Sequence, residues 1–190
     1  MFGHDAGVSQ AEIDLAEGVL RQTEAAVAAV RVDQGDAPTP CSGFDVSQLV
    51  NHLVGWAGSF GARLSGGPAI GDPNDYRAGT YPAVEFHLAA LAIIGAYRVA
   101  APPSQQLPVG FIVVEFLTHG WDLTTATGQE VVFAPTAAEL ALQTARQMLK
   151  PEYRGPGKAF GPEVAVSSTA DAVTQLVAFM GRDPDWQPAA

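Results

Sequence analysis

The chain has 190 residues, of which 47% are hydrophobic and 16% charged, a balance typical of a compact globular protein rather than a disordered one. Its formal net charge of −10 argues against nucleic acid and anionic membrane surfaces as partners. The single cysteine excludes an internal disulfide and cysteine-rich zinc sites, so a bound metal would need histidine and carboxylate ligands.

The first residues, MFGHDAGVSQ, contain neither the basic region nor the apolar region of a signal peptide. No apolar run reaches the ~20 residues that cross a bilayer. We therefore expect a cytoplasmic protein with no membrane partner.

Apolar periodicity and helix-end signals predict six helices and no alternating strands. Three helix starts match the capping-box pattern: Ser9 with Glu12, Asp45 with Gln48, and Thr136 with Glu139. Stretches rich in glycine and proline predict a linker, a long loop and an irregular arm, at residues 35–43, 65–80 and 151–168. The helices are predicted at residues 10–32, 45–64, 81–101, 109–128, 136–150 and 169–180. This pattern predicts an all-α bundle.

The fourth predicted helix, residues 109–128, reads VGFIVVEFLTHGWDLTTATG and is apolar around most of its circumference. Its polar exceptions, Glu115, Thr118, His119 and Asp122, fall within a sector of roughly 100° on the helical wheel. Glu115 and His119 are four residues apart and so point the same way. The pair can be half of a metal site, or the stripe can be the one solvated face of the helix; the spacing alone does not decide.

Other chemistry-bearing residues have ordinary structural interpretations beside the functional ones. His52 lies on the shoulder of an apolar stripe, where a histidine is more often structural than a ligand. Asp122 can orient a ligand imidazole or simply pack in the helix. His87 is expected on a structural or exposed face, and Cys41 as a small buried residue, since no basic neighbour in sequence lowers its pKa. Trp56, like Trp121, is expected in the core or a pocket wall.

Two segments together resemble a known family. TPCSGFDVSQLVNHLVGW, residues 39–56, resembles the helix-two motif of the DinB-like superfamily, in particular the N-terminal domain of mycothiol-dependent maleylpyruvate isomerases. EFLTHGWDLTTATGQ, residues 115–129, resembles the second motif of that group. The closing AFMGRDPDW, residues 178–186, is similar to the end of a short single-domain branch of metal-binding proteins.

The resemblance implies a DinB-like four-helix bundle, here with extra C-terminal helices and an irregular C-terminal arm. One domain is expected over residues 1–190, with a bundle core at about 8–150 and an extension at about 151–190. The family holds a divalent metal, usually zinc or nickel, and the matching ligand positions are His52, Glu115 and His119. Three protein ligands leave a position open for water or substrate. The usual tryptophan of the first motif is Phe44 here, which keeps an aromatic ring.

The resemblance further implies an enzyme that uses mycothiol as a cosubstrate, with a small-molecule thiol and an electrophile as partners; it also allows a homodimer. Maleylpyruvate isomerases of this type have a second, α/β domain, whereas only about forty residues follow the fifth predicted helix. We therefore expect thiol transfer in preference to isomerisation. The alternatives are a non-catalytic protein that binds a metal or small ligand, and a bundle that binds no metal.

Overall fold

The computed structural model of the chain describes residues 8–99, 107–155, 158 and 160–188. These residues form six α-helices and no β-strand, which confirms the predicted all-α fold. The helices are α1 (Gln10–Ala28), α2 (Val46–Ser65), α3 (Pro82–Arg98), α4 (Val109–Thr127), α5 (Pro135–Met148) and α6 (Ala172–Phe179). Short 3₁₀ turns lie at η1 (Val32–Gln34), η2 (Pro73–Asp75) and η4 (Pro151–Tyr153).

Two of the three predicted capping boxes are present, at the starts of α1 and α2. Ser9 caps α1 together with Glu12, and Asp45 caps α2 in the same reciprocal way. The box predicted at Thr136 is wrong, because α5 already begins at Pro135, with Ala134 as the N-cap residue and no side-chain cap. The fixed φ of proline suits the first helical position, so Thr136 lies inside the helix.

Several helices are shorter than their sequence patterns suggest. α1 ends at Ala28 and not at residue 32, because the backbone becomes extended at Arg31, whose N–H donates to the side chain of Gln34 in η1. α3 ends at Arg98, and residues 100 and 101 of the prediction lie outside the described residues. α6 begins only at Ala172, where Asp171 caps it.

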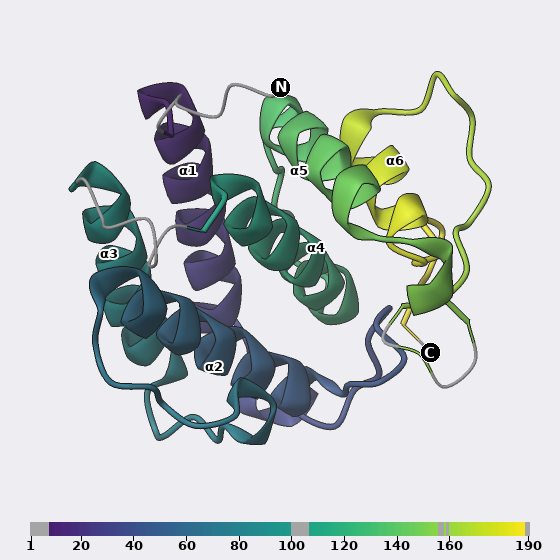
Figure 1. Cartoon of the computed structure of the whole chain (residues 1–190). Coiled ribbons are helices and arrows are strands. Elements are labelled where there is room, and N and C mark those ends of the chain that lie inside the picture. Colours follow the sequence, from purple (N-terminus) through teal and green to yellow (C-terminus); the bar gives the residue numbers. More distant parts are fainter. Residues whose placement is uncertain (1–7, 100–106, 156–157, 159, 189–190) are drawn as a thin grey trace.

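The helix that carries Glu115 and His119, α4, lies at the centre of the bundle (Figure 1) and packs against α1, α2 and α5. The close approach of α1 depends on Gly120, since a Cβ there would lie 2.9 Å from the Thr23 hydroxyl and 2.8 Å from the ring of Phe133. At this short distance between the helices, the hydroxyl of Thr23 on α1 donates a hydrogen bond to the carbonyl of Phe116 on α4, at 2.9 Å.

Helix α2 crosses beside α4 and packs most extensively on α3. Its buried residues include Leu49, Leu53 and Ala57, which fix the rotation of the helix about its axis. That rotation turns the shoulder residue His52 toward α4. At the other side α5 packs on α6, and the tail after α6 runs back to α4 (Figure 1). Within the described part of the chain, every helix is too short or too polar to cross a membrane.

Candidate metal centre

The structure brings the three side chains of the predicted ligand set together at the contact of α2 with α4. His52 Nε2 lies 2.9 Å from Glu115 Oε1, and His119 Nε2 lies 3.8 Å from the same oxygen. Each residue offers a ligand atom within 4.8 Å of those of the other two. One helix thus supplies two donors at i and i+4, and the neighbouring helix supplies the third.

The donor set suits a divalent metal. Metal–ligand bonds of about 2.0–2.1 Å place the donor atoms of a tetrahedral zinc site roughly 3.3 Å apart. The two distances to Glu115, 2.9 and 3.8 Å, bracket that value. Two imidazoles and a carboxylate are ligands that zinc, nickel and other first-row divalent ions accept, so the set does not select one of them.

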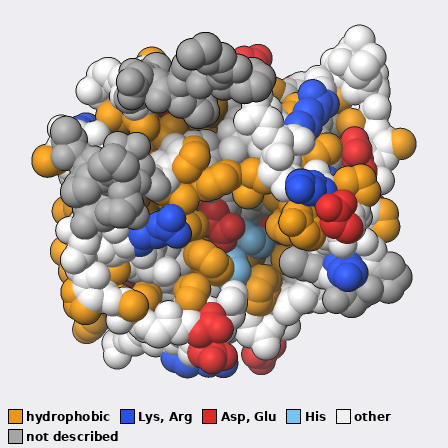
Figure 2. All heavy atoms as spheres, in the orientation of Figure 1, with side chains coloured by type: hydrophobic (Ala, Val, Ile, Leu, Met, Phe, Trp, Pro, Cys, Tyr) orange, Lys and Arg blue, Asp and Glu red, His pale blue; other side chains and the backbone are white. Residues whose placement is uncertain are grey.

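The cluster is largely buried, and Glu115 is the most exposed of its three side chains. The side chains of His52, His119 and Glu115 are 11%, 12% and 24% exposed. The ring centroids of Phe44 and Trp56 lie 4.8 and 6.1 Å from that of His52. Figure 2 shows histidine and acidic side chains near the centre of one face, surrounded by hydrophobic side chains. The partial exposure of Glu115 leaves the cluster in contact with solvent at this carboxylate.

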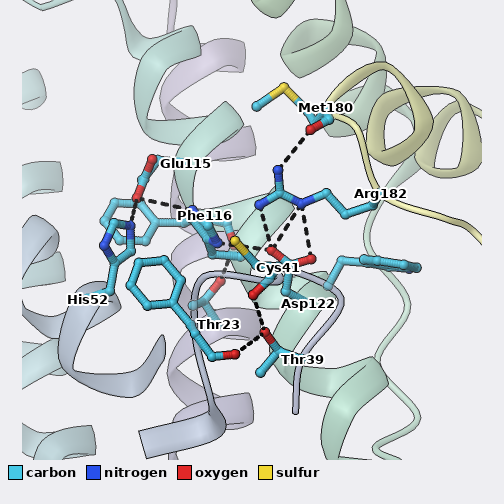
Figure 3. A network of polar contacts seen from close by, with 12 residues as sticks. Thr23, Thr39, Cys41, His52, Glu115, Phe116, Asp122, Met180 and Arg182 are labelled. Carbon is cyan, nitrogen blue, oxygen red and sulfur yellow. Dashed lines mark hydrogen bonds and ion pairs between the residues drawn. The ribbon is translucent and has the colours of Figure 1, made fainter. Parts of the chain in front are cut away.

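The side chain of Asp122 contacts His119, and Figure 3 shows the same carboxylate paired with Arg182. His119 Nδ1 lies 3.0 Å from Oδ2 of Asp122, which is fully buried. The same carboxylate accepts hydrogen bonds from Arg182, with Nη2 at 2.9 Å and Nε at 3.2 and 3.3 Å. Arg182 also donates to the carbonyl of Met180. Of the two interpretations of Asp122, the structure supports the one that orients His119.

The carboxylates of this network are ionised because their partners outweigh their burial. Burial raises the pKa of Glu115, but the charge of His119 and the hydrogen bond and charge of His52 hold it below its ordinary value. Burial likewise raises the pKa of Asp122, and Arg182 and His119 bring it below the ordinary value. The Asp122 carboxylate in turn raises the pKa of Arg182 despite burial, so this guanidinium stays charged.

These charge states assign the hydrogen-bond donors. An ionised carboxylate only accepts, so His52 Nε2–H donates to Glu115 and His119 Nδ1–H donates to Asp122. His119 Nε2 faces the Glu115 carboxylate at 3.8 Å. In a charged ring this nitrogen carries a second proton directed at Glu115, and in a neutral ring it carries a lone pair, which a cation between the two groups would stabilise. His52 Nδ1 is buried with no hydrogen-bond partner among the described residues.

Cys41 lies beside the site, next to His119 and Asp122, although nothing in its local sequence indicates this position. It shares a possible ligand group with His119 and Asp122, with all ligand atoms within 4.8 Å of one another. Burial raises the pKa of the Cys41 thiol, and the nearby charge of Arg182 only partly offsets the effect. Because Asp122 is already paired with Arg182, the positive guanidinium opposes a cation in this second group. Cys41 is a half-buried thiol beside the site and a poor nucleophile.

His87 lies outside the cluster, whereas Arg182 belongs to its surroundings without any signal in the local sequence. His87 lies on α3 outside the cluster, and its Nδ1 is 3.0 Å from Glu24 of α1, in agreement with its predicted structural or exposed position. Arg182 was not singled out in the sequence, although a buried Asp122 on an apolar helix needs a cationic partner. With only 10 Lys and Arg residues in the chain, few candidates for that partner exist.

Comparisons with known proteins identify the family of the chain, and the matched range includes His52 but not Glu115 or His119. The family model of the mycothiol maleylpyruvate isomerase N-terminal domain matches residues 16–109, a range that contains α2 and His52. Two relatives from Mycobacterium tuberculosis, the uncharacterized proteins MT0763 (strain CDC 1551 / Oshkosh) and Rv0738 (strain ATCC 25618 / H37Rv), are each 35% identical over 172 residues. Each match covers 83% of this chain and 90% of the relative. No solved structure matches the chain significantly. The chain belongs to the family of the mycothiol maleylpyruvate isomerase N-terminal domain.

Proposed function

We propose that the protein binds a divalent metal, zinc or nickel, through His52, Glu115 and His119. The observation that carries the proposal is the convergence of three donor groups, with His52 Nε2 and His119 Nε2 at 2.9 and 3.8 Å from Glu115 Oε1. When both imidazoles are neutral, with Nε2 unprotonated, a metal ion between these three atoms would bind all of them. We include residues 151–190 in the same domain, because Arg182 of the extension pairs with Asp122 of the bundle core.

We further propose that the bound metal serves a thiol-dependent transferase or isomerase-like enzyme, with mycothiol as cosubstrate. When bound, the metal supplies a positive charge that lowers the pKa of a nearby thiol, which makes the sulfur nucleophilic at neutral pH. In the transfer reaction the sulfur forms a bond to an electrophilic carbon, the leaving group departs with the bonding electrons, and the thiol proton passes to solvent.

The residues of the chain have distinct roles in this proposal. To bind the metal through Nε2, His52 gives up the proton that Nε2 donates to Glu115 and carries its proton on Nδ1. Both histidines then bind as neutral imidazoles, and Glu115 compensates one positive charge. Asp122 holds the proton on His119 Nδ1, which keeps Nε2 free to bind. Phe44 packs against the rings of both histidines and limits the access of water to them.

A test of the catalytic proposal measures thiol-dependent turnover. Protein loaded with zinc or nickel is incubated with a generic electrophile and a panel of low-molecular-weight thiols that includes mycothiol. The expected result is a rate that His119→Ala abolishes and that His87→Ala, a change of a histidine outside the cluster, leaves intact. Equal rates for wild type and His119→Ala across the panel would contradict the catalytic proposal.

A non-catalytic DinB-like protein that binds a metal or small ligand is the second candidate. The 2.9 Å hydrogen bond from His52 to Glu115 favours a third candidate, a bundle that binds no metal, because it stabilises the carboxylate without one. A proton on His119 Nε2 then replaces the cation between this ring and Glu115. Uptake of zinc or nickel without thiol-dependent turnover would support the second candidate, whereas protein that takes up neither metal would support a bundle that binds no metal.

A further inference from the structure

Arg182 links the C-terminal tail to the centre of the bundle. It follows α6 by three residues, and its side chain reaches Asp122 on α4, sixty positions earlier in the chain. The pair is buried: Arg182 is 7% exposed and Asp122 is 0% exposed. Its Nη2 and Nε groups form a fork on one carboxylate, and Nη1 is held by the carbonyl of Met180 (Figure 3). Such a forked pair fixes the orientation of both planar groups.

The orientation of Asp122 matters because its Oδ2 also accepts the hydrogen bond from His119 Nδ1, at 3.0 Å. A carboxylate that turned about its terminal bond would break that contact. The imidazole of His119 would then be free to rotate or to carry its proton on the other nitrogen. Either change removes the Nε2 lone pair from the side that faces Glu115.

We propose that Arg182 is a positioning residue for the metal centre. Its ion pair holds the Asp122 carboxylate, and through it the His119 ring, in the arrangement that aims Nε2 at Glu115 and His52. The inference rests on the proposed metal site. On this inference the tail after α6, which lies outside the residues 16–109 that the family model matches, helps to set the metal affinity.

The competing explanation is that Arg182 only fastens the tail to the bundle. Arg154 provides a matched control, since it belongs to the same C-terminal extension and anchors it by other contacts. Its Nη1 donates to the carbonyl of Gly161 at 3.1 Å, and its guanidinium lies over the ring of Phe179 at 4.5 Å. No hydrogen bond or ion pair among the described residues links Arg154 to Asp122 or His119.

The experiment measures the zinc affinity of the full chain by competition with a chromophoric chelator. Arg182→Gln is expected to weaken zinc binding by about 10- to 100-fold, the usual effect of removing a group that orients a metal ligand. The zinc affinity of Arg182→Lys is expected to lie between those of Arg182→Gln and the wild type, because an ammonium group keeps the charge but cannot form the two parallel hydrogen bonds. Arg154→Gln is expected to bind zinc as wild type does.

A double-mutant cycle tests whether Arg182 acts through Asp122. If it does, Arg182→Gln adds no further loss of zinc affinity in an Asp122→Asn background. The double variant also avoids a buried unpaired charge, so it keeps the test available should Arg182→Gln fail to fold. Additive losses from the two substitutions would overturn the inference.

A second readout needs no metal. Long-range ¹H–¹⁵N spectra of the metal-free protein report which nitrogen of His119 carries the proton. The wild type is expected to show the proton on Nδ1 and Arg182→Gln a mixture of both forms, with Arg154→Gln like the wild type.

Unchanged zinc affinity in folded Arg182→Gln, or an equal loss in Arg154→Gln, would overturn the inference. A wild type that binds no zinc or nickel would instead overturn the proposed metal site, and the spectra would still decide whether Arg182 holds the His119 ring.

Discussion

Asp122 of α4 and Arg182 of the C-terminal tail form a buried ion pair, with Arg182 Nη2 2.9 Å from Asp122 Oδ2. The same carboxylate oxygen holds His119 Nδ1 at 3.0 Å. One buried carboxylate therefore joins the candidate metal ligand to the end of the chain. Because both charged groups are almost completely removed from water, each depends on the other.

Removing one partner of this pair is expected to destabilise the metal-free protein by about 3–5 kcal/mol, because the remaining charge stays buried and unpaired. Arg182→Gln and Asp122→Asn, unfolded by urea in the presence of a chelator, measure this loss. Arg98→Gln is the control, since its pair with Glu17 is exposed and such pairs contribute little. Equal losses for Arg182→Gln and Arg98→Gln would contradict the buried placement of the Asp122 pair.

The same pair predicts how stability changes in acid. The pKa of Asp122 lies below the ordinary aspartate value of 3.8 in the folded protein, so the unfolded chain binds the proton more tightly. The ionised Asp122 therefore contributes fully to stability at pH values above its pKa in the unfolded chain. This contribution is lost as the pH falls through its lower pKa in the folded protein. Urea unfolding from pH 6 downward should show a loss below pH 3.8 that is smaller in Asp122→Asn. Parallel curves for the two proteins would contradict this account.

The core beneath the site gives a prediction about packing. Phe116 is completely buried on α4 and contacts the rings of Phe60 and Phe86 edge to face. Phe116→Ala is expected to lower the free energy of unfolding by about 3–5 kcal/mol. Leu88→Ala, at an exposed position of α3, is expected to change it by less than about 0.5 kcal/mol. A large loss at Leu88 would show that this face of α3 is covered in solution, as it would be in a homodimer.

Cys41 is expected to react slowly with alkylating reagents despite its place beside His119. Burial raises its pKa above the ordinary value of 9.0, so little thiolate is present at neutral pH. The rate of iodoacetamide labelling of the metal-free protein as a function of pH should have a midpoint above 9.0. A midpoint near pH 7 would show an activated thiol and would require a revised view of Arg182 and His119 as its neighbours.

Much of the fold follows from local sequence signals, because helix starts depend on a few adjacent residues. The capping boxes at Ser9 and Asp45 were predicted correctly. The start of α5 was predicted one residue late, because Pro135 and Thr136 both favour a helix start and proline takes the first position. The end of α1 was predicted late because apolar periodicity continues past Ala28, where the backbone leaves the helix.

The site was only partly predictable, because its members come from distant parts of the chain. The spacing of Glu115 and His119 indicated a shared face of one helix. Periodicity placed His52 at the shoulder of an apolar stripe, which could point inward or outward, and only the family resemblance grouped it with the other two as a ligand. Arg182 meets Asp122 across sixty positions, and no local pattern encodes such a contact. Only the need of a buried carboxylate for a cation could have indicated it.

The most direct test of the proposed metal centre is elemental analysis combined with thermal unfolding. Protein purified without a histidine tag and supplied with zinc or nickel should contain about one equivalent of metal. A ligand that binds only the folded state raises its stability, so a chelator should lower the Tm of the wild type. His119→Ala should lose both the metal and the response to chelator, whereas His87→Ala should keep both. Metal content well below one equivalent, with a Tm that the chelator does not change, would contradict the account.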